Sequence, residues 1–147
     1  MELLIAKPAA LTAMFATMIF FFAALVTGIW KYYHIHTSPR AQAPVYVNIA
    51  HRAALMYSFG GLLLAVFASL SAFPNAVNVV AVVLPLFFFG FAILGYIMLG
   101  FRNTTDNQFL NPPNPKGVLM LMLALIVAEV GGFLVLAAGF VVRVIRP

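Results

Sequence analysis

Cysteine is absent from this chain, and charged residues are scarce. Because none of the 147 residues is a cysteine, disulfides, thiolate metal sites, cysteine nucleophiles and iron–sulfur clusters are excluded. Asp, Glu, Lys and Arg make up 7% of the residues, whereas a soluble domain carries about 25%. With 65% hydrophobic residues, the chain has too little charge to cover a surface that faces water. These shortages indicate a membrane protein.

The few basic residues are scattered singly along the chain and give a net charge of +5. A nucleic-acid-binding protein would need them clustered into a patch. We therefore expect no nucleic-acid partner and interpret the Lys and Arg residues as anchors at the membrane interface.

Four apolar stretches are each close to the ~20 residues that a membrane-spanning helix needs. They run roughly over residues 9–30, 50–73, 76–100 and 117–142. We predict an all-α integral membrane protein in which residues 1–147 form a single four-helix transmembrane domain in the lipid bilayer. An even number of helices places both termini on one side and the two polar loops on the other.

The distribution of basic residues favours one orientation. The loop face carries Lys31, Arg40, Arg52, Arg102 and Lys116, and the terminal face carries Lys7, Arg143 and Arg146. Because cytoplasmic loops of membrane proteins carry an excess of Lys and Arg, the ratio of five to three predicts cytoplasmic loops. We expect the protein in a bacterial inner (cytoplasmic) membrane.

His51 stands at the predicted start of the second helix. At about 100° per residue, the helix face beneath it contains mostly small residues, here called the small-residue strip: Ala54, Leu55, Ser58, Gly61, Leu62 and Ala65. A flat cofactor could lie on this strip with its metal bound by the imidazole. The same residues would also suit an interfacial histidine above a surface on which another helix packs. Both interpretations stay open.

The other two histidines form a His-x-His pair, His34 and His36, in the first predicted loop. In an extended loop the two side chains would point the same way, as two metal ligands do. No carboxylate or further histidine is near in sequence, which favours solvated loop residues instead.

Tyr96 and Asn103 lie near one face at the loop end of the third helix, with Phe89, Ala92 and Gly100. A hydroxyl and an amide two turns apart could hydrogen-bond a small polar ligand beneath the membrane surface. The alternative is an interfacial tyrosine and an asparagine that caps the helix.

Glu129 is the most unusual residue of the sequence. It lies about 12 residues into the fourth stretch, roughly 18 Å deep at 1.5 Å per residue, near the bilayer centre. A carboxylate there is costly and is a functional candidate by default. No cationic side chain is expected at this depth, so we predict an uncharged carboxyl group. It could hold helices or subunits together, or bind a proton or a ligand.

Several short segments carry a resemblance to a known family. They are Gly28-Ile29-Trp30, Ala50-His51 after a loop with His36, Ser38 and Pro39, Gly90-Phe91-Ala92 followed by Gly95-Tyr96, and Asn107-Gln108-Phe109. Over roughly the first three helices, the chain resembles the small four-helix membrane proteins that include styrene oxide isomerase and hydroxylaminobenzene mutase.

The resemblance implies a haem b group near the loop-side surface, between subunits of a homotrimer, with His51 as the ligand of the iron. In the isomerase, the ferric iron acts as a Lewis acid on an epoxide oxygen, and a hydride shift gives an aldehyde. Ser58 would then lie beside the ring, and Arg52 or Arg102 would pair with the propionates. Tyr96 or Tyr57, together with Asn103, would orient a small apolar substrate.

Some positions depart from the family pattern. Tyr57 and Ile93 stand where the isomerase has asparagines, its third-helix tyrosine falls at Ile97 beside Tyr96, and Glu129 has no counterpart. Haem binding therefore carries over better than the isomerase reaction does.

Three functions are consistent with the sequence. The first is a haem-dependent isomerase of a small apolar substrate. The second is a non-catalytic accessory subunit of a membrane complex, and the third is a small proton or cation transporter subunit that uses Glu129. We also predict a homo-oligomer, because Gly60, Gly61, Gly131 and Gly132 offer surfaces for close helix approach.

Overall fold

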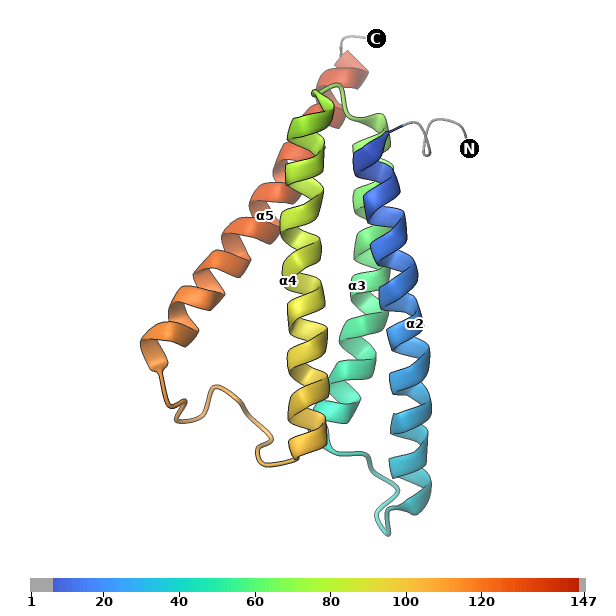
Figure 1. The fold of residues 1–147 in the computed structure, drawn as a ribbon, viewed down its shortest axis with the longest axis vertical. Helices are drawn as coiled ribbons and strands as arrows, with labels where there is room; N and C mark the ends of the chain where they lie inside the picture. The colour runs from blue at the N-terminus through green and yellow to red at the C-terminus, as the bar shows by residue number, and fades with distance from the viewer. Residues whose placement is uncertain (1–6, 146–147) are drawn as a thin grey trace.

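The computed structural model describes residues 7–145 and is built from helices (Figure 1). The helices are α2 (Pro8–Thr37), α3 (Val45–Leu70), α4 (Asn75–Arg102) and α5 (Pro115–Ile145). All four are long and apolar enough to cross a membrane, and residues 7–145 contain no strand. The prediction of an all-α, four-helix integral membrane protein is confirmed.

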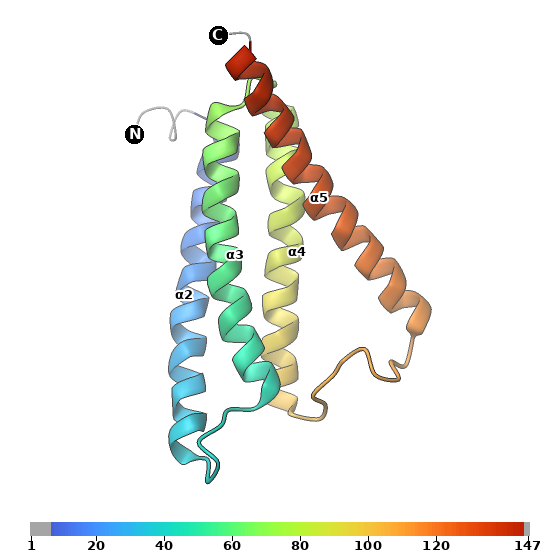
Figure 2. The same ribbon diagram turned by 180° about the vertical axis from the view of Figure 1, so that it is seen from behind.

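Helices α2, α3 and α4 run side by side, whereas α5 leans away from them at one end (Figures 1 and 2). Lys7 and Ile145, the described ends of the chain, lie at the same end of the molecule as the α3–α4 turn. The Lys7 ammonium donates a hydrogen bond of 3.0 Å to the Ser71 carbonyl there. The Ala72 N–H donates one of 3.0 Å to the Gly139 carbonyl. The predicted placement of both ends on one side is thus confirmed, while Arg146 lies outside the described residues.

The core of the three-helix bundle is made largely of alanine. The fully buried alanines are Ala9, Ala10 and Ala13 of α2 and Ala50, Ala54, Ala65 and Ala68 of α3. Small side chains let helix backbones approach closely, which is how membrane helices gain packing contacts where lipid is as apolar as the core. Large apolar residues accordingly face outward, among them Phe22, Ile29 and Phe59.

Helix α5 packs on the bundle only through its C-terminal half. Its buried residues are Ala128, Gly132, Leu136 and Gly139, and none of residues 115–127 is buried. At the crossing with α4, a Cβ atom on Gly132 would stand 2.5 Å from the Ala81 carbonyl oxygen and 2.6 Å from Pro85 Cγ. Pro85 has no N–H and cannot donate the helical hydrogen bond to the Ala81 carbonyl. Gly132 of α5 approaches α4 at this carbonyl. Helix α5 is therefore fixed at the terminal end and diverges toward the loops.

The first loop is shorter than hydrophobicity predicted. Helix α2 continues beyond Trp30 through Thr37, and α3 begins at Val45 instead of near residue 50. At 1.5 Å per residue, the 30 residues of α2 span about 45 Å, more than the ~30 Å hydrocarbon core. The polar turns of both helices thus extend past the apolar segment that marks them in the sequence.

Candidate functional site

His51 lies in the second turn of α3, not at its start, and its imidazole is held against α2. The Nδ1 atom is 2.9 Å from the Ala24 carbonyl oxygen. Because a carbonyl only accepts, Nδ1 donates this hydrogen bond, which leaves Nε2 as the ring nitrogen that could bind a metal. Next to the ring, a Cβ atom on Gly28 would stand 3.0 Å from His51 Cε1. The ring orientation is thus fixed by contact with α2.

The small-residue strip below His51 is filled by the protein itself. Ala54, Ser58 and Ala65 are buried, and the Ser58 hydroxyl donates a 2.6 Å hydrogen bond to the Leu55 carbonyl of its own helix. A Cβ atom on Gly61 would stand 2.6 Å from Thr17 Oγ1 of α2. Helix packing, the alternative that the sequence left open, occupies the strip. Ser58 therefore faces the bundle interior and is not exposed to a cofactor outside it.

His34 and His36 do not form the paired ligands of an extended loop. Both lie in the last turn of α2, where residues two positions apart point in different directions. The His34 ring lies against Trp30, with ring centroids 5.8 Å apart. The His36 ring stacks on Tyr32 at 5.9 Å. The loop conformation predicted for this pair was wrong, because the helix continues past the apolar segment.

Tyr57 and Tyr96 are brought together on the other side of α3. They line an open hollow of about 320 Å³ with Ile49, Arg52, Ala53 and Met56. Tyr57 stacks on Phe89 with ring centroids 4.3 Å apart and planes 8° from parallel. Tyr96 stacks with Tyr46 at 6.1 Å. Tyr57 and Tyr96, two of the three residues predicted to orient a substrate, therefore share one site. Arg52, a predicted partner of the haem propionates, lies in the same hollow.

Asn103 does not join them. It follows the last residue of α4 with φ 46° and ψ 39°, and its N–H donates a 2.8 Å hydrogen bond to the Leu99 carbonyl. Asparagine tolerates this left-handed conformation better than most residues, so the helix-capping alternative describes its role. Its side chain is exposed, as is that of the neighbouring Arg102.

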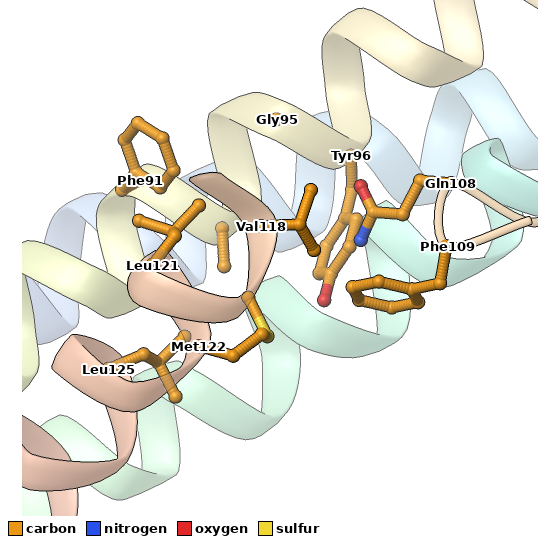
Figure 3. Close-up of a pocket in the computed structure, with 10 residues that line it drawn as sticks. Phe91, Gly95, Tyr96, Gln108, Phe109, Val118, Leu121, Met122 and Leu125 are labelled. Carbon is orange, nitrogen blue, oxygen red and sulfur yellow. The ribbon is translucent and has the colours of Figure 1, made fainter. Parts of the chain in front are cut away.

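A cavity of about 120 Å³ lies between α4 and α5, where the two helices diverge (Figure 3). Its lining comes from α4, the following loop and α5: Phe91, Ala92, Gly95, Tyr96, Gln108, Phe109, Val118, Leu121, Met122 and Leu125. The loop residues Gln108 and Phe109 lie beside Tyr96 (Figure 3). The Gln108 N–H donates a 2.6 Å hydrogen bond to the Tyr46 hydroxyl, which ties this loop to α3.

Glu129 lies just beyond this cavity. Leu125, which lines the cavity, lies one helical turn before Glu129, and Gly132, which packs on α4, lies three residues after it. Residues at these spacings share one face of a helix, so Glu129 is on the face of α5 that is turned toward α4. Its Oε1 atom is buried and has no hydrogen-bond partner among residues 7–145. Glu129 thus adds a carboxyl group on the face of α5 that lines the cavity.

No protein-family model, curated protein or solved structure matches the chain.

Within residues 7–145, no group of three or more His, Cys, Asp or Glu side chains is arranged to bind a metal ion. A haem iron needs only an axial ligand from the protein, so the residue to test is His51. Its imidazole fits that role, because Nδ1 is engaged and Nε2 is free.

His51 and the tyrosines face different ways. Tyr57 is six positions after His51, which turns it about 120° around the helix at 100° per residue. His51 contacts α2, while Tyr57 stacks on Phe89 of α4. Within the chain, the candidate iron ligand and the candidate substrate site are therefore separate.

Proposed function

We propose that this protein is a membrane haem b-dependent isomerase of the styrene oxide isomerase type, with His51 as the iron ligand and a small apolar substrate such as an epoxide. The observation that carries the proposal is the fixed imidazole: Nδ1 donates to the Ala24 carbonyl at 2.9 Å. Histidines that bind metals usually donate their other ring N–H to a carbonyl or carboxylate, which sets the tautomer and the ring orientation. The sequence resemblance points to the same residue.

When bound, a ferric haem supplies a Lewis acid that polarises the epoxide oxygen for rearrangement to an aldehyde. The protein would contribute hydrogen-bond donors, because the Tyr57 and Tyr96 hydroxyls share one hollow. Arg52 lines the same hollow, and Arg102 is exposed at the loop end of α4. Guanidinium groups pair well with carboxylates, which supports these arginines as partners of the propionates.

The active unit in this proposal is a homo-oligomer, a trimer by the resemblance. His51 and the tyrosines lie on different faces of α3, so a site between subunits lets His51 of one subunit serve the tyrosines of another. Gly60, Gly61 and Gly132 pack within the chain, whereas a Cβ atom on Gly131 would meet nothing within 4 Å. Three of the four glycines therefore make their close contacts within the chain, so the oligomer of this proposal rests on the separate faces of His51 and the tyrosines. Native mass spectrometry that detects only monomer at every concentration would count against an oligomer.

The apolar exterior suits a substrate that dissolves in lipid. The diverging half of α5 exposes Leu119, Met120 and Val127. An apolar epoxide would partition into the bilayer and reach the hollow lined by Tyr57 and Tyr96 without crossing water. We propose the bacterial inner (cytoplasmic) membrane as its location.

The visible absorption spectrum tests the proposal. Protein purified after expression with ample haem should show a Soret band, and His51→Ala should abolish the band or greatly weaken haem retention. His34→Ala and His36→Ala are matched controls, since both rings lie in the last turn of α2, and they should leave the band largely intact. A wild-type protein with no Soret band would refute the haem proposal and leave the accessory-subunit function in its place.

A further inference from the structure

The cavity between α4 and α5 has mostly apolar walls, and Tyr96 and Gln108 are its polar lining residues. Phe91 of α4 and Leu121, Met122 and Leu125 of α5 form most of its walls (Figure 3). Glu129 follows Leu125 on the same face of α5, one turn deeper in the membrane. Because helix side chains tilt toward the N-terminus of their helix, the Glu129 side chain extends toward Leu125 and the inner end of the cavity. A molecule in the cavity would have hydrocarbon on its sides and this carboxyl group beyond its inner end.

The volume limits the size of an occupant. The cavity measures about 120 Å³, and an engineered cavity of about 150 Å³ lined by Leu, Ile and Phe is large enough for benzene. A single ring, or a hydrocarbon chain of similar bulk, is the largest group that fits without movement of α5.

The unpaired Glu129 oxygen limits the chemistry of the occupant. Oε1 is buried without a partner among residues 7–145, and buried polar groups are nearly always hydrogen-bonded. A neutral carboxyl group both donates and accepts a hydrogen bond, and a hydroxyl group does the same. A charged amine would instead have to lose its hydration in an apolar cavity, which is unfavourable.

We propose that this cavity binds a small neutral molecule made of one ring, or a similar hydrocarbon group, and one hydroxyl group. The hydroxyl exchanges hydrogen bonds with the Glu129 carboxyl, and Tyr96 lines the cavity beside it. The hydrocarbon part contacts Phe91, Met122 and Leu125. This site goes beyond the proposed isomerase function and needs neither haem nor His51.

The test uses three ligands of one shape: toluene, benzyl alcohol and benzylamine. The full chain is placed in lipid nanodiscs with ¹³C-methyl methionine, and the methyl resonance of Met122, which lines the cavity, is followed by NMR during titration. The exposed Met18 of α2 reports non-specific effects. Benzyl alcohol should bind roughly two- to tenfold more tightly than toluene, the effect of one net hydrogen bond. Benzylamine should bind no more tightly than toluene.

Variants separate the polar end from the cavity. Glu129→Leu should remove the advantage of benzyl alcohol and keep toluene binding, whereas Glu129→Gln, which still donates and accepts, should keep most of it. Gly95→Leu should abolish binding of both ligands, because a side chain there enters the cavity, yet a Cβ atom meets nothing within 4 Å. Gly131→Leu is the matched control, since it is equally free of contacts but lies outside the cavity, and it should bind like wild type.

Equal affinities for toluene and benzyl alcohol would overturn the proposal. Binding that survives Gly95→Leu would overturn it as well. A preference for benzylamine that is lost in Glu129→Gln would also overturn it, because such a preference would indicate a cation site. The titration is repeated in His51→Ala, where the same affinities are expected. Failure of the haem proposal, read from the Soret band, is therefore distinguishable from failure of this one.

Discussion

Gly28 has no side chain, and the His51 ring occupies the space beside it. A Cβ atom there would stand 3.0 Å from Cε1 and 3.2 Å from Nδ1 of His51. We predict that Gly28→Val turns the ring away from the Ala24 carbonyl and lowers haem affinity about 10- to 100-fold, the usual effect of losing such a partner. Haem content per protein, measured from the Soret band, is the readout, with Gly131→Val as control. Unchanged haem content in Gly28→Val would show that the fixed ring orientation is unimportant.

The charge of Glu129 can be tested by two substitutions. Glu129→Gln should leave the free energy of unfolding in detergent nearly unchanged, because it replaces a neutral carboxyl group by a neutral amide. Glu129→Lys should lower it by about 3 kcal/mol, the cost of a charged side chain at the centre of a membrane helix. Infrared difference spectra between wild type and Glu129→Gln give an independent measurement. A carboxylate band assigned to Glu129 at neutral pH would contradict the prediction.

Single residues could be predicted from the sequence where their chemistry is unusual for their place. Glu129 is a carboxyl group in an apolar stretch, and His51 is a histidine at a membrane boundary, so both stood out. The Ala24 carbonyl that holds His51 is a backbone group and has no sequence signature. The role of Gln108 depends on how a loop folds back onto Tyr46, which no helical periodicity describes.

At the scale of helices, α5 depends on one close crossing with α4. We predict that Gly132→Leu lowers the free energy of unfolding by about 1–3 kcal/mol, the usual cost of inserting bulk into packed positions. The reason is that its Cβ atom would already stand 2.5 Å from the Ala81 carbonyl oxygen. Gly131→Leu adds the same side chain one position away, where a Cβ atom meets nothing within 4 Å, and should be nearly neutral. Denaturation in mixed micelles compares the two, and equal stabilities would show that the crossing is not tight.

The existence of the four helices followed from the sequence, but their ends did not. Hydropathy reports which residues suit lipid, whereas a helix continues for as long as its backbone hydrogen bonds are favourable. Helix α2 therefore keeps its ladder through Thr37, beyond the apolar residues, and carries His34 and His36 with it. This is why the two histidines, predicted in a loop, belong to a helix.

For the whole molecule, the divergence of α5 is the feature that sequence reasoning could not supply. Small residues suit packing within a chain and between chains equally well, so the pattern of glycines predicts close contacts without saying which helices make them. Gly61 packs on α2 and Gly132 on α4, while a Cβ atom added to Gly131 would meet nothing within 4 Å. The cavity between α4 and α5 exists because Gly132 brings only the C-terminal half of α5 against α4. No single sequence segment encodes this arrangement.

The topology of the whole molecule can be measured because the chain has no cysteine. Single-cysteine variants at Gln42 and Thr104 mark the two loops, and variants at Asn75 and Val144 mark the opposite end; all four positions are exposed. Since the loop face carries more Lys and Arg, we predict that a membrane-impermeant maleimide labels Asn75→Cys and Val144→Cys in spheroplasts. It should label Gln42→Cys and Thr104→Cys only after lysis. The reverse pattern would contradict the orientation alone, because the two loops would still share one side. Different labelling of Gln42→Cys and Thr104→Cys would contradict the fold, because α3 and α4 between them return the chain to the side from which it started.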